Sequence, residues 1–389
     1  MIDANRFFTW LPDDQRRIAI YWLPAFIAGM LAWMAFVTTG QTPLVRATGL
    51  ALVIVGVTLT LRRLGAILAV TGGLALAFSP AFWSQTGGGD SIGTATTVVA
   101  LIAASFAAVI VVQMSRRPYI ALGLGASVFA MIFWSQIGTP RSLRLTGLLT
   151  AWLLFLLVDA LFTSNPRPDE AQPAPIENQH TFGLLIILCV GTLNDPLFVL
   201  LAPAVIIGLW LSWTPLPRWF WAALSIITLI GIRGIIVTYI DPAWWTISAT
   251  EAERMGIAAP YILADGWRVG ARWVNLMEVI IHQFTLVGAA LSILGLARLA
   301  RWYPVLGIVS MVAYGFYAIF GLVYFGADRE VLLMPLFIIQ IVWLTYAVYT
   351  FGQWLEKSLR SNVQRAHWLA TSAYILLPAY LFLLVTRVT

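Results

Sequence analysis

Long apolar segments separated by short polar stretches run through the whole chain of 389 residues. Many of them approach the roughly 20 residues that an α-helix needs to cross the hydrocarbon core of a bilayer. The alternating ten-residue pattern of a transmembrane β-barrel is absent from the sequence. We therefore predict an all-α, polytopic transmembrane bundle of about 11–13 membrane segments, at 19–38, 45–61, 64–83, 95–114, 118–134, 145–163, 182–192, 196–213, 217–240, 276–297, 303–325, 331–351 and 368–386.

The apolar stretch 181–213 is too long for one crossing and short for two. In its middle, Asn194, Asp195 and Pro196 indicate a turn, because proline breaks a helix and restricts the residue before it. We expect a helical hairpin here, and a single span is the alternative.

Composition agrees with a membrane protein, since 60% of the residues are hydrophobic and only 10% are charged. Soluble domains average about 25% charged residues. The net charge of +6 therefore does not predict a nucleic-acid partner. In a membrane protein, the clusters of arginines at the helix ends indicate the orientation in the bilayer. The single cysteine, Cys189, excludes a disulfide framework within the chain.

With the hairpin in place, 14 of the 23 basic residues fall on one side of the membrane. Positive charge accumulates in cytoplasmic loops, so we expect this side to be cytoplasmic, the N-terminus inside and the C-terminus outside. The basic residues on that side are Arg6, Arg16, Arg17, Arg62, Arg63, Arg116, Arg117, Arg167, Arg218, Arg298, Arg301, Lys357, Arg360 and Arg365.

The chain divides into two membrane halves, 1–163 and 181–389, joined by a proline-rich cytoplasmic linker at 164–180. The polar residues that could carry chemistry fall on the outer side. The first half presents an outer loop with Asp90, and the second presents a long outer loop at 241–275.

Asp90 follows Phe82, Trp83 and a run of three glycines in "AFWSQTGGGDSIG". Glycines let a ligand approach the backbone, and a carboxylate there can act as a general base. The alternative is a flexible loop with a solvated acid. A second Phe-Trp-Ser-Gln at 133–136 lacks the aspartate, and on its own this pattern fits an aromatic girdle at the membrane interface.

Arginines mark two further outer-side candidates. Arg329 lies between Asp328 and Glu330 at the start of a predicted helix, where a cation needs an anionic neighbour or a ligand phosphate. In the long loop, Arg268 and Arg272 are spaced i,i+4, and Tyr261 and Trp267 could wall a substrate beside them. The alternative for most of that loop is a helix lying on the membrane surface.

Three weaker candidates remain open. Glu278 and His282 share a helix face and could contribute to a metal site, although a polar pair facing the bundle is favoured. Asp195 is a weak candidate for a catalytic acid. Asp159 and Arg233 lie inside predicted spans and could pair with each other.

The segment "LALAFSPAFWSQTGGGD" resembles one in bacterial membrane proteins of the GT-C glycosyltransferase superfamily, in the branch related to protein O-mannosyl-transferases. There, a Ser-Pro-x-Phe-Trp-x-Gln pattern is followed after five positions by an acid, which corresponds to Asp90. The stretches 314–344 and 191–211 resemble the branch's late helix pair and its central hairpin.

The resemblance implies a GT-C-like fold in the plasma (inner) membrane of a bacterium and a sugar donor linked to polyprenyl phosphate. Transfer takes place on the non-cytoplasmic face. Asp90 would serve as the base, and Arg329, helped by Arg268 or Arg272, would hold the departing phosphate. The sequence requires no cofactor, and a divalent cation stays an option.

The chain departs from the family in its first outer loop, 38–49, which has no Asp or Glu where the family's principal catalytic acid usually lies. Activity would therefore need another acid, such as Asp90 or Asp195. One alternative is an inactive GT-C-like subunit that binds lipid or partner proteins in a membrane complex. Another is a transporter of a lipid-linked sugar.

Overall fold

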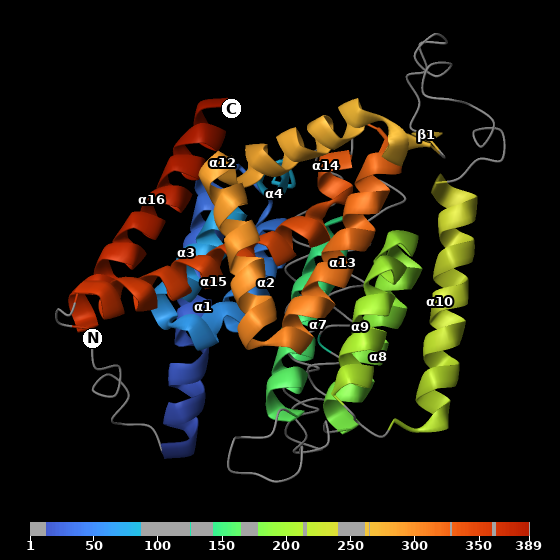
Figure 1. Ribbon diagram of the computed structural model, residues 1–389, viewed down its shortest axis with the longest axis horizontal. Coiled ribbons are helices and arrows are strands. Elements are labelled where there is room, and N and C mark those ends of the chain that lie inside the picture. Colours follow the sequence, from blue (N-terminus) through green and yellow to red (C-terminus); the bar gives the residue numbers. More distant parts are fainter. Residues whose placement is uncertain are drawn as a thin grey trace.

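The computed structural model describes residues 13–86, 125, 143–164, 178–212, 216–239, 261–263, 265–326, 329–359 and 363–388. These residues form a helical bundle with one short pair of two-residue strands (Figure 1). Seven of the described helices are long and apolar enough to cross a membrane. The prediction of an all-α, multi-pass membrane protein is thus confirmed. The predicted segments 95–114 and 118–134 lie outside the described residues.

The seven long apolar helices are α1, α2, α10, α12, α13, α15 and α16. In chain order, the elements are α1 (Asp13–Thr38), α2 (Leu44–Leu61), η2 (Arg62–Leu64), α3 (Ala66–Ala77), α4 (Pro80–Trp83), α7 (Leu143–Ser164), α8 (Asn178–Asn194), η3 (Pro196–Leu201), α9 (Ala202–Leu211), α10 (Arg218–Tyr239), β1 (Tyr261–Ile262), η5 (Gly266–Arg268), α12 (Gly270–Trp302), α13 (Pro304–Val323), β2 (Tyr324–Phe325), α14 (Arg329–Leu332), α15 (Met334–Leu359) and α16 (Val363–Val388).

Helix α15 is the most buried of the spans, and helices from both halves of the chain pack around it. Its neighbours include α12, α13 and α16 from the second half and α2, α3 and α7 from the first. At Gly295, a β-carbon would come within 1.8 Å of the carbonyl oxygen of Trp343. Only glycine allows α12 and α15 to approach so closely, as small residues do in membrane bundles.

The stretch 181–213 forms the predicted hairpin, with α8 leading into the turn and η3 and α9 returning from it. Thr192 before the turn and Val199 after it both contact Gly231 of α10. The turn itself is at Asp195, whose carboxylate accepts the backbone N–H of Leu197 at 3.0 Å. This contact caps η3 and explains why Asn-Asp-Pro ends α8 at this point.

Helix α7 runs from one end of the bundle to the other and makes polar contacts at both. Near its start, Thr146 donates to the Asp195 carboxylate at the hairpin turn. Near its end, Asp159 pairs with Arg63, and the guanidinium of Arg63 lies over the Phe162 ring. We call the end that carries Arg63 the basic end. The end of α12, with Arg298 and Arg301, lies there too, because Tyr303 directly after α12 contacts Phe162 of α7.

The predicted span 64–83 is wrong in one respect, because the structure breaks it into α3 and α4. The break falls at Phe78 and Ser79, and Ser79 has extended backbone angles (φ −68°, ψ 143°). A residue before proline is pushed out of the helical region, and Pro80 itself is favoured at the first position of a new helix. Ser-Pro therefore ends one helix and begins another.

The predicted span 276–297 is also corrected, because α12 begins at Gly270 and bends at Phe284 and Thr285. Its 33 residues would reach about 50 Å if straight, well beyond a bilayer core of about 30 Å. Residues 270–284, the surface segment, lie across the top of the bundle in Figure 1, and residues 285–302 descend through it. The surface segment thus extends further along the chain than the outer loop predicted at 241–275.

The sequence suggested that Asp159 could pair with Arg233, but the structure shows that it does not. Its two carboxylate oxygens accept from Arg63 at 2.8 Å and from His180 at 3.2 Å. Arg233 lies on an exposed face of α10 instead. Through Asp159, the start of α8 and the 3-10 turn after α2 are both held to α7, at the basic end of the bundle.

We expect Asp159→Asn to lower thermal stability in detergent at neutral pH. The substitution removes the anionic partner of both Arg63 and His180, and the pair is only partly screened by solvent. The free energy of unfolding should fall by about 1–2 kcal/mol. As a control, Arg298→Gln changes an exposed cation at the same end and should leave the melting temperature within about one degree of the original. Equal shifts in both variants would contradict a structural role for Asp159.

Candidate functional site

Several elements from distant parts of the sequence meet at the end of the bundle opposite the basic end. They are α4, the surface segment of α12, α14, and the strand pair β1–β2. Helix α4 contacts both α12 and α14. We call this meeting point the junction and define it by residues 79–83, 270–284 and 329–332. The two motifs that carried the family resemblance therefore converge here, although some 250 positions separate Ser79 from Arg329.

Gln283 connects the surface segment to α4. Its side chain is fully buried, and its Oε1 accepts the backbone N–H of Ala81 at 2.8 Å. Ala81 belongs to the first turn of α4, where N–H groups have no partner within the helix. The other end of the amide, Nε2, is buried and has no hydrogen-bond partner in the described structure. The NH2 group of Gln283, with its two N–H donors, is therefore available inside the junction.

The aromatic pair of the first motif lies in the core. Phe82 and Trp83 are buried, and both pack against Phe36 of α1, with ring centroids 6.0 and 5.8 Å apart. Trp83 also meets Phe382 of α16 edge-on. In this copy of Phe-Trp-Ser-Gln, the two aromatic side chains thus contribute to the core of the bundle and do not form an exposed aromatic girdle. The second copy, at 133–136, lies outside the described residues.

Arg329 opens α14 and is half-buried beside the surface segment. Its guanidinium reaches the carbonyl oxygen of Asn275 at 3.5 Å, which is a long and weak contact. Partial burial lowers the pKa of this guanidinium, and the neighbouring Glu330 raises it. Arginine stays charged at any physiological pH, so Arg329 presents a cation at the junction.

The arginines of the 241–275 loop separate into two environments. Arg272, at the start of the surface segment, is only 6% exposed, and the residue takes part in an interaction within the chain. Arg268 is exposed and lies over the ring of Trp267, 4.7 Å from its centroid. Their i,i+4 spacing therefore does not make a single clamp, because η5 ends between them.

Two of the predicted wall residues come from the same loop. Trp267 is about half exposed, and its carbonyl accepts the indole N–H of Trp273 at 2.9 Å. The backbone of Tyr261 pairs with Phe325 in the strand pair, which joins this loop to the chain leading into α14. The structure describes the backbone of Tyr261 but not its side chain.

The surface segment has three distinct faces. Its buried face packs on the bundle, and the rest of its surface divides into an exposed apolar face and an exposed polar face. A helix that lies at a membrane interface needs such a division among protein, lipid and water. The buried residues are Arg272, Leu276, Val279, Ile280 and Gln283, the exposed apolar residues are Trp273, Val274 and Met277, and the exposed polar residues are Asn275, Glu278 and His282.

Glu278 and His282 thus face away from the bundle, in contrast to the inward pair that the sequence favoured. Among the described residues, no group of three or more His, Cys, Asp or Glu side chains could hold a metal ion. A carboxylate and an imidazole on an exposed helix face fit contact with water at the membrane surface.

Asp195 is buried at the hairpin turn, where it is 1% exposed. Besides capping η3, its Oδ1 accepts the hydroxyl of Tyr239 at 3.2 Å, and its Oδ2 accepts Thr146 at 3.4 Å. A carboxylate held in this way connects α7, α10 and the hairpin. The geometry gives Asp195 a positional role and leaves no open approach for a substrate hydroxyl.

Two predicted residues, Asp90 and Asp328, lie outside the described structure. The chain leaves the junction after Trp83, and Thr86 then packs against Gly40 in the turn between α1 and α2. A residue that the sequence reasoning missed is Arg46, in the first turn of α2. It is 7% exposed and takes part in a contact within the chain. A lone arginine near a helix start gives no sequence signal of such burial.

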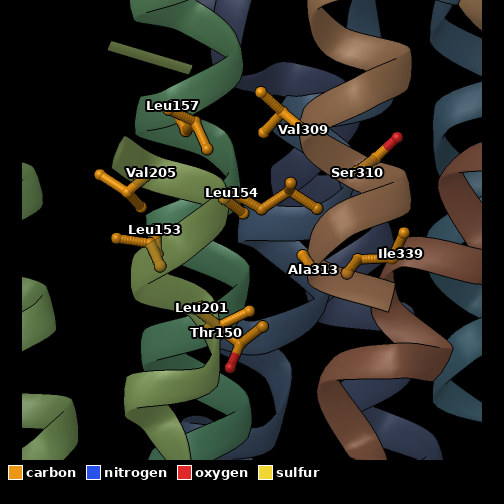
Figure 2. Close-up of a pocket in the computed structure, with 11 residues that line it drawn as sticks. Thr150, Leu153, Leu154, Leu157, Leu201, Val205, Val309, Ser310, Ala313 and Ile339 are labelled. Carbon is orange, nitrogen blue, oxygen red and sulfur yellow. The ribbon is translucent and has the colours of Figure 1, made fainter. Parts of the chain in front are cut away.

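A small cavity lies deeper in the bundle, between α7, α9, α13 and α15 (Figure 2). Its lining is apolar except for the hydroxyl groups of Thr150 and Ser310. The space open to the centres of water molecules is about 20 Å³, which is enough for a water molecule but not for a sugar. This cavity is therefore not a substrate site.

The junction combines cationic side chains, a buried amide donor and an exposed aromatic and apolar rim. Guanidinium groups bind phosphate through paired hydrogen bonds, and a rim of this kind suits the chain of a lipid. The described residues at the junction are therefore of types that can bind a phosphate and an apolar chain. No family model, curated protein or solved structure matches the chain.

The contact between Gln283 and Ala81 predicts opposite effects for two leucine substitutions. Gln283→Leu leaves the N–H of Ala81 buried without a partner and should destabilise the protein by about 1–3 kcal/mol. Gln340 is equally buried but makes no side-chain hydrogen bond in the described structure. Gln340→Leu should therefore be neutral or stabilising. Thermal unfolding of both variants in detergent checks this, and a loss of equal size in both would contradict the bridge to α4.

The three faces of the surface segment predict where probes attached to it will lie. In a Cys189→Ala background, a spin label at Val274→Cys should collide with oxygen dissolved in the lipid. A label at Glu278→Cys should collide with a water-soluble nickel complex. Ile293→Cys, an exposed position near the middle of the descending part of α12, serves as the deep control and should give the highest oxygen accessibility. Similar accessibilities at 274 and 278 would exclude an interfacial position.

Proposed function

We propose that the protein is a membrane glycosyltransferase that takes a sugar from a polyprenyl-phosphate carrier at the junction. The convergence of α4 and α14 under the surface segment carries this proposal. It brings the two motifs that resemble the GT-C superfamily to one end of the bundle. It also sets Arg329 beside a segment with an exposed apolar face, where a lipid-linked substrate can approach from the bilayer.

In the proposed reaction, an acceptor hydroxyl attacks the anomeric carbon of the donor sugar. The bond from that carbon to the phosphate oxygen breaks, and polyprenyl phosphate departs with the bonding electron pair. Arg329 stabilises the charge that develops on the phosphate, and Arg272 of the surface segment is a second candidate for this role. The hydroxyl proton passes to a carboxylate, and Asp90 is the candidate because its loop begins at the junction.

The distribution of charge supports an orientation for this reaction. Arg63, Arg298 and Arg301 gather at the basic end, which we assign to the cytoplasm by the positive-inside rule. The junction then faces the non-cytoplasmic side of a bacterial plasma membrane. Lipid-linked sugars that have been moved across the membrane would be available on that side.

A transfer assay with purified protein and a radiolabelled sugar on polyprenyl phosphate tests this function. Asp90→Asn should lower the rate by at least about 100-fold, because it removes the base. Arg329→Gln should lower it by about 10- to 100-fold, because one donor to the leaving phosphate is lost. Arg298→Gln, at the basic end, is the matched control and should leave the rate unchanged.

Two results would argue against the proposal in different ways. Full activity of Asp90→Asn would remove Asp90 from the mechanism and require another acid. If the folded protein binds the lipid-linked sugar without transferring it to any acceptor, it would instead be an inactive subunit that keeps the binding site. The first outer loop has no acid where the family's principal catalytic acid usually lies, so binding without transfer is the result expected of an inactive subunit.

A further inference from the structure

Arg233 is an unusual residue in α10, because it is a charged side chain on a lipid-facing stripe. Helix α10 lies at the edge of the bundle and packs mainly on α8 and η3 (Figure 1). Arg233 is exposed, and it forms no ion pair or hydrogen bond with any described residue. The residues around it on this stripe are bulky and apolar, namely Ile226, Leu229, Ile230, Ile236 and Val237.

The opposite face of α10 fixes its rotation. A β-carbon at Gly231 would come within 2.5 Å of Val199, and one at Gly234 would come within 2.8 Å of Pro196. These two glycines therefore press against the returning arm of the hairpin. Any rotation that buried Arg233 would force larger side chains into this contact. Arg233 must consequently face away from the bundle.

The depth of Arg233 follows from a second contact. The last residue of α10, Tyr239, donates its hydroxyl to Asp195 at the hairpin turn. The helix has 22 residues and spans about 33 Å, which matches the thickness of a bilayer core. Arg233 is six residues from this end and therefore lies about 9 Å inside it. A lipid phosphate can meet a long arginine side chain at this depth, with local thinning of the bilayer.

An arginine in contact with hydrocarbon is unfavourable unless an anion accompanies it. The planar guanidinium matches phosphate oxygens, with which it forms two parallel hydrogen bonds. A second transmembrane protein is a poorer match for this face. Contacts between transmembrane helices favour small residues, and α10 uses its two glycines on the inner side while it presents branched residues outward.

We propose that Arg233 holds the phosphate group of an anionic phospholipid against the outer face of α10, at the junction end of the bundle. This lipid site is separate from the junction and does not depend on sugar transfer. It takes a glycerophospholipid from the surrounding leaflet, whose acyl chains lie along the exposed isoleucine, leucine and valine side chains.

Native mass spectrometry of protein extracted from nanodiscs of phosphatidylcholine and phosphatidylglycerol, in equal amounts, tests this site. The unmodified protein should retain one phosphatidylglycerol molecule more strongly than phosphatidylcholine. Arg233→Leu should reduce its occupancy at least fivefold, and Arg233→Lys should reduce it less, because lysine keeps the charge without the paired hydrogen bonds. Leu376→Ala, on an exposed face of α16 and away from α10, is the control and should retain the lipid.

Thermal unfolding of each variant checks that it is folded. We expect Arg233→Leu to fold, because leucine suits a lipid-facing position. Unchanged phosphatidylglycerol occupancy in Arg233→Leu would overturn the proposal. The proposal would also fail if cross-linking through α10 showed dimers that Arg233→Leu abolishes, because a protein would then be the partner. Both results are independent of any transfer activity.

Discussion

The bend in α12 at Phe284 and Thr285 is the feature on which one end of the molecule depends. Thr285 has φ 66° and ψ 167°, a backbone conformation that residues other than glycine rarely adopt. Such a conformation costs about 1–3 kcal/mol and persists only where the surroundings enforce it. Here, Phe284 is fully buried, and Thr285 Oγ1 accepts the N–H of Gly288 and so caps the descending part of the helix. Packing on both sides of the bend thus offsets its strain.

The consequences of the bend extend through the junction. Because residues 270–284 lie across the bundle, Gln283 can reach the backbone of α4 and Asn275 can reach Arg329. A straight α12 would carry these residues away from α4 and α14. The convergence of the two motifs is therefore a result of backbone geometry at two residues, neither of which has a catalytic role in the proposed reaction.

The sequence predicted the elements of the bundle better than the contacts between them. Apolar length located α10 and α13 to within two residues, and Asn-Asp-Pro correctly indicated the hairpin. The bend in α12 was not predicted, because neither of its two residues, Phe284 and Thr285, is a proline or a glycine. The partners of Asp159 were also missed, since Arg63 lies 96 positions away and no local pattern connects them. For the candidate site, the sequence identified Arg329 and Arg272 by residue type, but it could not show that Arg272 is buried, whereas Arg268 is exposed.

The arginines at the two ends of the bundle have different partners. At the basic end, Asp159 neutralises Arg63 and joins it to His180, so charge there contributes to the contact between helices. At the junction, the Arg329 guanidinium donates a long hydrogen bond of 3.5 Å to the carbonyl oxygen of Asn275, and Glu330 is a neighbouring charge. A hydrogen bond of this length compensates only part of the free-energy cost of partly burying a cation. In the proposed function, the phosphate of a lipid-linked sugar would match the charge of Arg329, and its lipid chain would match the exposed apolar face beside it.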